Sequence, residues 1–185
     1  MALTLTGRIV ALHEHLETAG LAHAFGGALA LAFCTAEPRA TRDIDLNVFV
    51  GIDRLDDLLA ALPDGVAVSP AARAGLRRDG QARLWWDATP VDVFLSNHPF
   101  HDRAEDNRRH VPFAGVADLP VLACPDLAVF KAFFARPKDA VDVATMAAAG
   151  SVDLDQLDRS VGALLGGEER AAFLARVREL ATEID

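Results

Sequence analysis

The sequence is poor in cysteine and in long hydrophobic runs, and each shortage argues against a class of protein. Its two cysteines, Cys34 and Cys124, are far apart and lie in no CxxC or Cys/His spacing, so we expect reduced thiols in the core rather than a metal site. No apolar run is long enough to span a membrane, and the N-terminus lacks the basic and apolar regions of a signal peptide. We therefore expect a cytoplasmic protein that does not contact membranes.

Positive charge is also scarce. Lys and Arg number 18 against 27 Asp and Glu, which gives a formal net charge of −9. Such a protein has no broad attraction for a polyphosphate chain, so general nucleic-acid binding is disfavoured. The local clusters Arg77–Arg78 and 108–110 are interpreted first as solvated surface, and second as contacts for a small anion or one RNA segment.

The patterns that are present indicate an α/β protein. The chain has 185 residues, of which 51 % are hydrophobic, enough for one domain with a packed core. Apolar periodicity predicts elements of both kinds. The expected helices cover 6–19, 28–33, 55–62, 127–134, 140–149, 154–165 and 168–184. The expected strands cover 21–25, 43–50, 81–86 and 91–95, the last two as a hairpin, and 98–110 reads as an exposed loop.

The most informative segment is the expected strand 43–50, which contains Asp43 and Asp45 among apolar residues. Residues two apart on a strand point to the same face, with Cα atoms about 6.5 Å apart. Two carboxylates held this closely repel each other, and a divalent cation relieves the repulsion. The alternative is that both acids face water at the strand end or pair with Arg39 and Arg42.

A third acid, Asp92, interrupts the apolar strand 91–95 and points away from its valines. An acid in such a strand needs a partner. If this strand lies beside 43–50, all three acids converge, and three carboxylates suit a two-metal Mg²⁺ site. The alternative is a surface acid next to a turn.

Two further features predict phosphate binding. Gly26 and Gly27 separate a strand from a helix, where unpaired N–H groups and absent side chains let a triphosphate approach the backbone. Lys131 is one of only two lysines in a chain whose other basic residues are arginines. This bias indicates that the compact ammonium group of Lys131 has a specific role, such as a phosphate contact. The alternative interpretation is that Lys131 lies on the flank of a helix and covers apolar surface with its alkyl chain. The first interpretation of Arg39 is that it stabilises the loop before the strand. The second is that it contacts a phosphate.

A glycine pair, a DxD strand and a later lone acid, in this order, resemble the DNA-polymerase-β-like nucleotidyltransferase superfamily. The run from Gly26 to Leu46, with Arg39-Ala-Thr-Arg-Asp43-Ile-Asp45, is most similar to the AbiE-type (AbiEii-like) toxin nucleotidyltransferases. The later segment with Lys131, Arg136, Asp139 and Asp142 is similar to the C-terminal K…R-x-x-D…D run of those proteins.

The resemblance implies a fold, a reaction and a set of site residues. The fold is a small mixed sheet flanked by helices, with an α/β core over 1–118 and a C-terminal helical part over 119–185. The enzyme would use Mg²⁺ to transfer a nucleoside monophosphate from an NTP to an acceptor hydroxyl. The catalytic and metal-binding residues are Asp43, Asp45 and Asp92, and the nucleotide-binding residues are Gly26, Gly27, Lys131 and Arg39. Asp139 or Asp142 corresponds to a further acid.

The acceptor and the partners stay open at this point. The acceptor is either tRNA, as for a toxin with an antitoxin partner, or a small molecule such as an aminoglycoside. A different class of function is a catalytically inactive binding module or antitoxin-type partner with the same fold. The intact set of three acids argues against it, because an inactive copy has no reason to keep repelling charges together.

Overall fold

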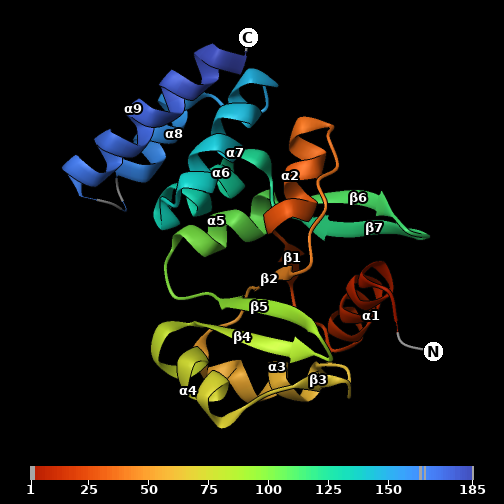
Figure 1. Ribbon diagram of the computed structural model, residues 1–185. Helices are drawn as coiled ribbons and strands as arrows, with labels where there is room; N and C mark the ends of the chain where they lie inside the picture. The colour runs from red at the N-terminus through yellow and green to blue at the C-terminus, as the bar shows by residue number, and fades with distance from the viewer. Residues whose placement is uncertain (1–2, 163, 165, 185) are drawn as a thin grey trace. The chain divides into compact units, whose positions relative to one another are not determined.

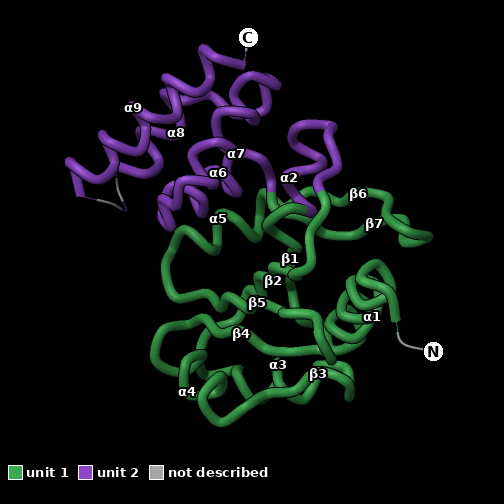
Figure 2. The backbone as a smooth tube through the Cα atoms, in the orientation of Figure 1, with its two compact units in different colours: residues 1–28, 40–122 green, residues 29–39, 123–185 purple. Residues whose placement is uncertain are grey.

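The computed structural model describes residues 3–162, 164 and 166–184, and it forms two compact units (Figure 1, Figure 2). Residues 1–28 and 40–122 make the first unit, and residues 29–39 and 123–185 make the second. The division at residue 119 that the sequence suggested stays a prediction. Among the described residues, no helix is long and apolar enough to cross a membrane.

The first unit contains all the strands that the structure describes, together with most of the short helices. Its helices are α1 (Leu5–Thr18), η1 (Ile52–Arg54), α3 (Leu55–Ala61), α4 (Pro70–Asp79) and α5 (Phe100–Asn107). Its strands are β1 (His23–Phe25), β2 (Ile44–Val48), β3 (Val66–Ala67), β4 (Gln81–Trp86), β5 (Thr89–Leu95), β6 (Arg109–Phe113) and β7 (Val116–Val121). The strands form one sheet in the order β3-β4-β5-β2-β1-β7-β6. The sheet is mixed, as expected, because β2 pairs with β5 and β1 with β7 in parallel, whereas the other pairs are antiparallel.

The sheet has one fully apolar face at its centre. On β2 and β5, residues such as Ile44, Leu46, Val91 and Val93 are at most 2 % exposed. The residues between them on β5 are only half-buried, among them Asp92. This alternation fixes the register, because a slip of one residue would turn the carboxylates into the core.

The hairpin expected from 81–86 and 91–95 is present as β4 and β5. Trp86 pairs with Thr89, which leaves Asp87 and Ala88 as a two-residue turn. Asp87 has a φ of 51°, a left-handed conformation that Asp tolerates better than most residues with a side chain.

The second unit consists of helices α2 (Gly27–Thr35), which begins at the border between the units, α6 (Cys124–Phe134), α7 (Pro137–Ala148), α8 (Leu154–Gly162) and α9 (Gly167–Ile184). Cys34 of α2 and Cys124 of α6 form a disulfide across a sequence separation of 90. The expectation of two reduced thiols is therefore wrong. Disulfides are rare in cytosolic proteins, so the cytoplasmic location stays a prediction.

The segment 98–110 also differs from its expected loop. It forms α5 and the start of β6. The helix buries only His101 and Ala104, three residues apart, so its apolar stripe is too short to be recognised in a polar sequence. The structure likewise adds α4 and β7, which the sequence analysis did not assign.

Candidate active site

Two of the three expected metal ligands are direct neighbours in the sheet. The parallel pairing of β2 and β5 sets Asp45 beside Asp92, and neighbouring residues of paired strands share a face. Asp43 immediately precedes β2 and is half-buried. Its carboxylate accepts a hydrogen bond from the Thr41 hydroxyl, which fixes its orientation at the strand entrance.

A basic side chain that the sequence analysis missed lies at this cluster. Arg83 of β4 is opposite Asp92 in the antiparallel β4–β5 pair. Its Nε donates to Asp92 Oδ1 and its Nη2 to Asp92 Oδ2, both at 2.7 Å. The hydrogen bond to Asp92 raises the pKa of the Arg83 guanidinium most, and the charges of Asp43 and Asp45 raise it further. One cation thus interacts with all three carboxylates.

The glycine pair lies directly against the carboxylate of Asp45. The Gly26 amide donates to the Asp45 carbonyl at 2.9 Å. A Cβ atom on Gly27 would lie 1.7 Å from Asp45 Oδ2, and Gly27 has a φ of 53°. Both observations require glycine at position 27.

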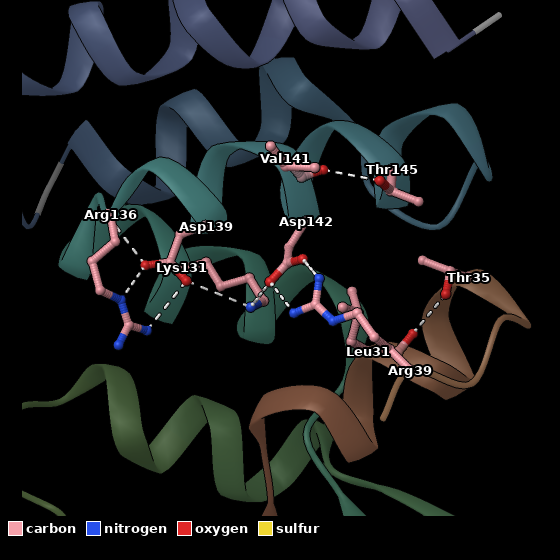
Figure 3. Close-up of polar contacts among 9 residues, drawn as sticks. All are labelled: Leu31, Thr35, Arg39, Lys131, Arg136, Asp139, Val141, Asp142 and Thr145. Atoms are coloured by element: carbon pink, nitrogen blue, oxygen red, sulfur yellow. Dashed lines mark hydrogen bonds and ion pairs between the residues drawn. The ribbon is translucent and has the colours of Figure 1, made fainter. Parts of the chain in front are cut away.

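Lys131 and Arg39 lie in the second unit, where they share one buried acid (Figure 3). Lys131 Nζ is 2.6 Å from Asp142 Oδ2 and 3.6 Å from Asp139 Oδ1. Arg39 donates to both oxygens of Asp142, at 2.6 and 3.3 Å. Arg136 in turn holds Asp139. The K…R-x-x-D…D run is therefore one continuous ion-pair network between α6, α7 and the segment after α2.

The expected nucleotide-binding residues thus fall into two groups. Gly26 and Gly27 lie with the carboxylates in the first unit, whereas Lys131 and Arg39 lie in the second. Lys131 is 7 % exposed, so it is neither a surface lysine nor a side chain that reaches bulk water. Arg83 could have been found from the expected hairpin, because closing 81–86 onto 91–95 with a two-residue turn sets it opposite Asp92.

The chemistry of this donor set fits divalent magnesium. Carboxylate oxygens are the hard ligands that Mg²⁺ prefers. The guanidinium of Arg83 lies beside Asp92, and a metal ion at this position would likewise reduce the repulsion between the carboxylates. Asp43, Asp45 and Asp92 are the residues that would hold the ions.

No protein-family model and no curated protein matches the chain. Solved structures do match it. The solution structure of the antibiotic-resistance factor ANT(2'')-Ia is 15 % identical, with a TM-score of 0.59, and the match covers 100 % of this chain and 98 % of that one. The chain has the nucleotidyltransferase fold.

Two further structures agree with this fold. A crystal structure of ANT(2'')-Ia in complex with adenylyl-2''-tobramycin has a TM-score of 0.60 at 16 % identity, over 91 % of this chain and 95 % of that one. An antigenic nucleotidyltransferase-like protein from Paracoccidioides brasiliensis has a TM-score of 0.53 at 15 % identity, over 96 % and 88 %. At such identities the similarity establishes the fold and leaves the activity to be argued from the site. The expected fold class is confirmed.

Proposed function

We propose that the chain is a Mg²⁺-dependent nucleotidyltransferase that moves a nucleoside monophosphate from an NTP to an acceptor hydroxyl and releases pyrophosphate. The observation that carries this proposal is the register of β2 and β5, which sets Asp45 beside Asp92. Asp45 and Asp92 on one face, with Asp43 just before them, repel each other, and a divalent cation would offset this repulsion beyond what the single charge of Arg83 supplies. The nucleotidyltransferase fold supports the same conclusion.

Asp43, Asp45 and Asp92 would hold two Mg²⁺ ions, which when bound would orient the acceptor hydroxyl and offset charge on the leaving pyrophosphate. Asp92 is the proposed acceptor for the proton of the attacking hydroxyl. Both of its oxygens accept hydrogen bonds from Arg83, and each oxygen keeps a second lone pair that could receive the proton.

The proposed phosphate contacts come from backbone and cationic groups. Gly26 and Gly27 at the start of α2 would present N–H groups to the triphosphate, because no side chain stands in front of them. Lys131 and Arg39 would offset phosphate charge.

For the acceptor, we favour a small cationic polyol such as an aminoglycoside. The net charge of −9 attracts a cation and repels RNA, and the similar ANT(2'')-Ia structure contains adenylyl-2''-tobramycin. The second candidate is an AbiE-type toxin that modifies tRNA and has an antitoxin partner. It is supported by the K…R-x-x-D…D run, whose members Lys131, Arg136, Asp139 and Asp142 interact directly.

A transfer assay with separate acceptors tests the proposal. The purified chain is incubated with Mg²⁺ and each α-³²P-labelled NTP, with a panel of aminoglycosides in one series and total RNA in another. We expect label on an aminoglycoside and none on RNA. Label on tRNA alone would select the toxin function. No transfer and no NTP binding would favour the inactive binding module. Asp45→Asn should abolish transfer, and Asp64→Asn, an exposed acid in a turn, is the matched control.

A further inference from the structure

A second group of ligand-type side chains lies on the opposite face of the sheet from the carboxylates. His23 of β1 pairs with Val48 of β2, and neighbouring residues in a pair share a face. Val48 is three residues from Asp45, an odd spacing that puts the two side chains on opposite faces. The sheet itself therefore separates His23 from Asp45 and Asp92.

Helix α1 brings two more ligand-type residues to His23. His13 and Glu17 are four residues apart, so they project from the same side of the helix. One ligand atom from each of His13, Glu17 and His23 lies within 4.8 Å of the other two. Both histidines are buried, at 9 % and 1 % exposure, whereas the Glu17 side chain is 60 % exposed.

The hydrogen bonds of His23 fix which of its nitrogens is a ligand. His23 Nδ1 is 2.9 Å from the Leu21 carbonyl oxygen, and a carbonyl only accepts, so Nδ1 carries the proton. Nε2 therefore has the lone pair that can bind a metal ion, once it no longer accepts the hydrogen bond from His13. A histidine that donates its other nitrogen to a backbone carbonyl has the orientation that metal ligands usually have.

The spacing of the two imidazoles fits a single tetrahedral ion. His13 Nδ1 is 3.1 Å from His23 Nε2, and two nitrogens at Zn–N distances of about 2.0–2.1 Å in tetrahedral geometry lie about 3.3 Å apart. In the metal-free protein His13 Nδ1 donates a hydrogen bond to that lone pair. Binding requires His13 to carry its proton on Nε2 instead of Nδ1.

Glu17 supplies the charge that two neutral imidazoles lack. Its Oε1 is 4.0 Å from His23 Nδ1, the nitrogen that carries the proton, so binding would require a change of rotamer that moves the carboxylate toward Nε2. The exposed side chain of Glu17 leaves room for such a change. The positive charge of Arg108 also acts on His23. Arg108 in turn lies 3.8 Å from Glu105, so an acid partly offsets its repulsion of a cation.

We propose that His13, Glu17 and His23 bind one divalent transition-metal ion, with Zn²⁺ as the representative ion and water in the fourth position. Two imidazoles and a carboxylate suit Zn²⁺ and its neighbours in the first transition row, whereas Mg²⁺ prefers oxygen ligands alone. The ion ties α1 to β1 and so stabilises the first unit. This site does not depend on the nucleotidyltransferase proposal.

Metal titration of the chelator-treated protein tests this site. Zn²⁺ binding is measured by calorimetry, and Co²⁺ binding by its visible absorption, which is intense for four-coordinate and weak for six-coordinate ions. Both titrations are made in the Asp45→Asn background, which removes binding at the carboxylates on the other face. The disulfide leaves no free cysteine, so thiolates do not contribute to the signal.

We expect one Zn²⁺ per chain and a four-coordinate Co²⁺ spectrum. Glu17→Gln should weaken Zn²⁺ binding at least about tenfold, and Glu14→Gln, an exposed acid on the same helix, should leave it unchanged. Because Glu17 is exposed, its substitution should not affect folding. Absence of Zn²⁺ binding, an unchanged affinity in Glu17→Gln, or a six-coordinate Co²⁺ spectrum would mean that the two histidines form a hydrogen-bonded pair only.

Discussion

Arg83 and Asp92 face each other across the β4–β5 pair, with both nitrogen–oxygen distances at 2.7 Å. The ion pair is bidentate, with two parallel N–H···O bonds, and this is one of the stronger kinds of ion pair at a half-exposed position. It also means that Arg83 and a metal ion compete for the same two oxygens. Affinity for Mg²⁺ should therefore depend on the charge at position 83.

The first prediction concerns Arg83→Ala. Without the guanidinium, Asp92 is available to a cation, so the Mg²⁺ concentration that gives half-maximal thermal stabilisation should fall severalfold. The metal-free protein should lose about 1 kcal/mol of folding free energy, because three carboxylates are left without their common counter-ion. Differential scanning fluorimetry across a Mg²⁺ series measures both effects. Arg78→Ala is the matched control, since Arg78 pairs with Asp79 away from the cluster. An unchanged Mg²⁺ response in Arg83→Ala would show that the two cations do not compete.

The second prediction concerns Gly27. A Cβ at this position would overlap Asp45 Oδ2, and the positive φ adds backbone strain. We expect Gly27→Ala to displace the Asp45 carboxylate, and so to weaken Mg²⁺·NTP binding in calorimetry. Gly115→Ala is the comparison, because Gly115 also has a positive φ but has open space around its Cβ position. If both substitutions affect NTP binding equally, backbone strain rather than the contact with Asp45 explains the effect.

The third prediction follows from the disulfide between Cys34 and Cys124. Closing a loop of this length restricts the unfolded chain, and native disulfides typically contribute about 2–4 kcal/mol. Addition of dithiothreitol should lower the melting temperature, and the double variant Cys34→Ala/Cys124→Ala should melt at the reduced temperature whether or not the reductant is present. A wild-type melting temperature that is the same with and without reductant would contradict the pairing.

The fourth prediction concerns pH. The unfolded chain binds a proton at His23 below pH 6.5, whereas the folded protein does so only below about 4, chiefly because burial disfavours the charged ring. His13 and Arg108 act in the same direction, and the Leu21 carbonyl and Glu17 oppose it. The free energy of unfolding should therefore be highest above pH 6.5 and fall by about 3 kcal/mol as the pH approaches 4.

Urea unfolding of the metal-free protein at pH 7 and pH 4.5 measures this dependence. His23→Asn keeps a donor for the Leu21 carbonyl and should flatten the dependence, whereas His110→Asn, an exposed histidine, should not. An equal pH dependence in the wild type and in His23→Asn would contradict the role assigned to His23.

Local patterns were enough to predict much of this fold. The helix before Gly20, the strands around Asp45 and Asp92, and the helices after Pro125 all follow from apolar periodicity. The sequence suggests the pairing of β2 with β5 only as the condition under which Asp92 would meet the other two acids. These inferences needed only residues that are close in sequence, or a charge that needs a partner.

What the sequence could not supply depends on distant parts of the chain. The pairing of Cys34 with Cys124 joins residues with a separation of 90, and nothing near either cysteine signals the other. Residues 29–39 group with the C-terminal helices, a grouping of distant segments that sequence order does not specify. The nearness of His13 to His23 depends on how α1 packs on the sheet, which periodicity does not specify.

Binding of a Mg²⁺-loaded, non-hydrolysable NTP to the wild type, Asp45→Asn and Asp64→Asn, measured by calorimetry, tests the central proposal most directly. We predict that Asp45→Asn folds normally but loses at least about tenfold in affinity, whereas Asp64→Asn binds like the wild type. Equal affinity in all three proteins, in the presence of Mg²⁺, would contradict the assignment of the carboxylates as the metal and nucleotide site.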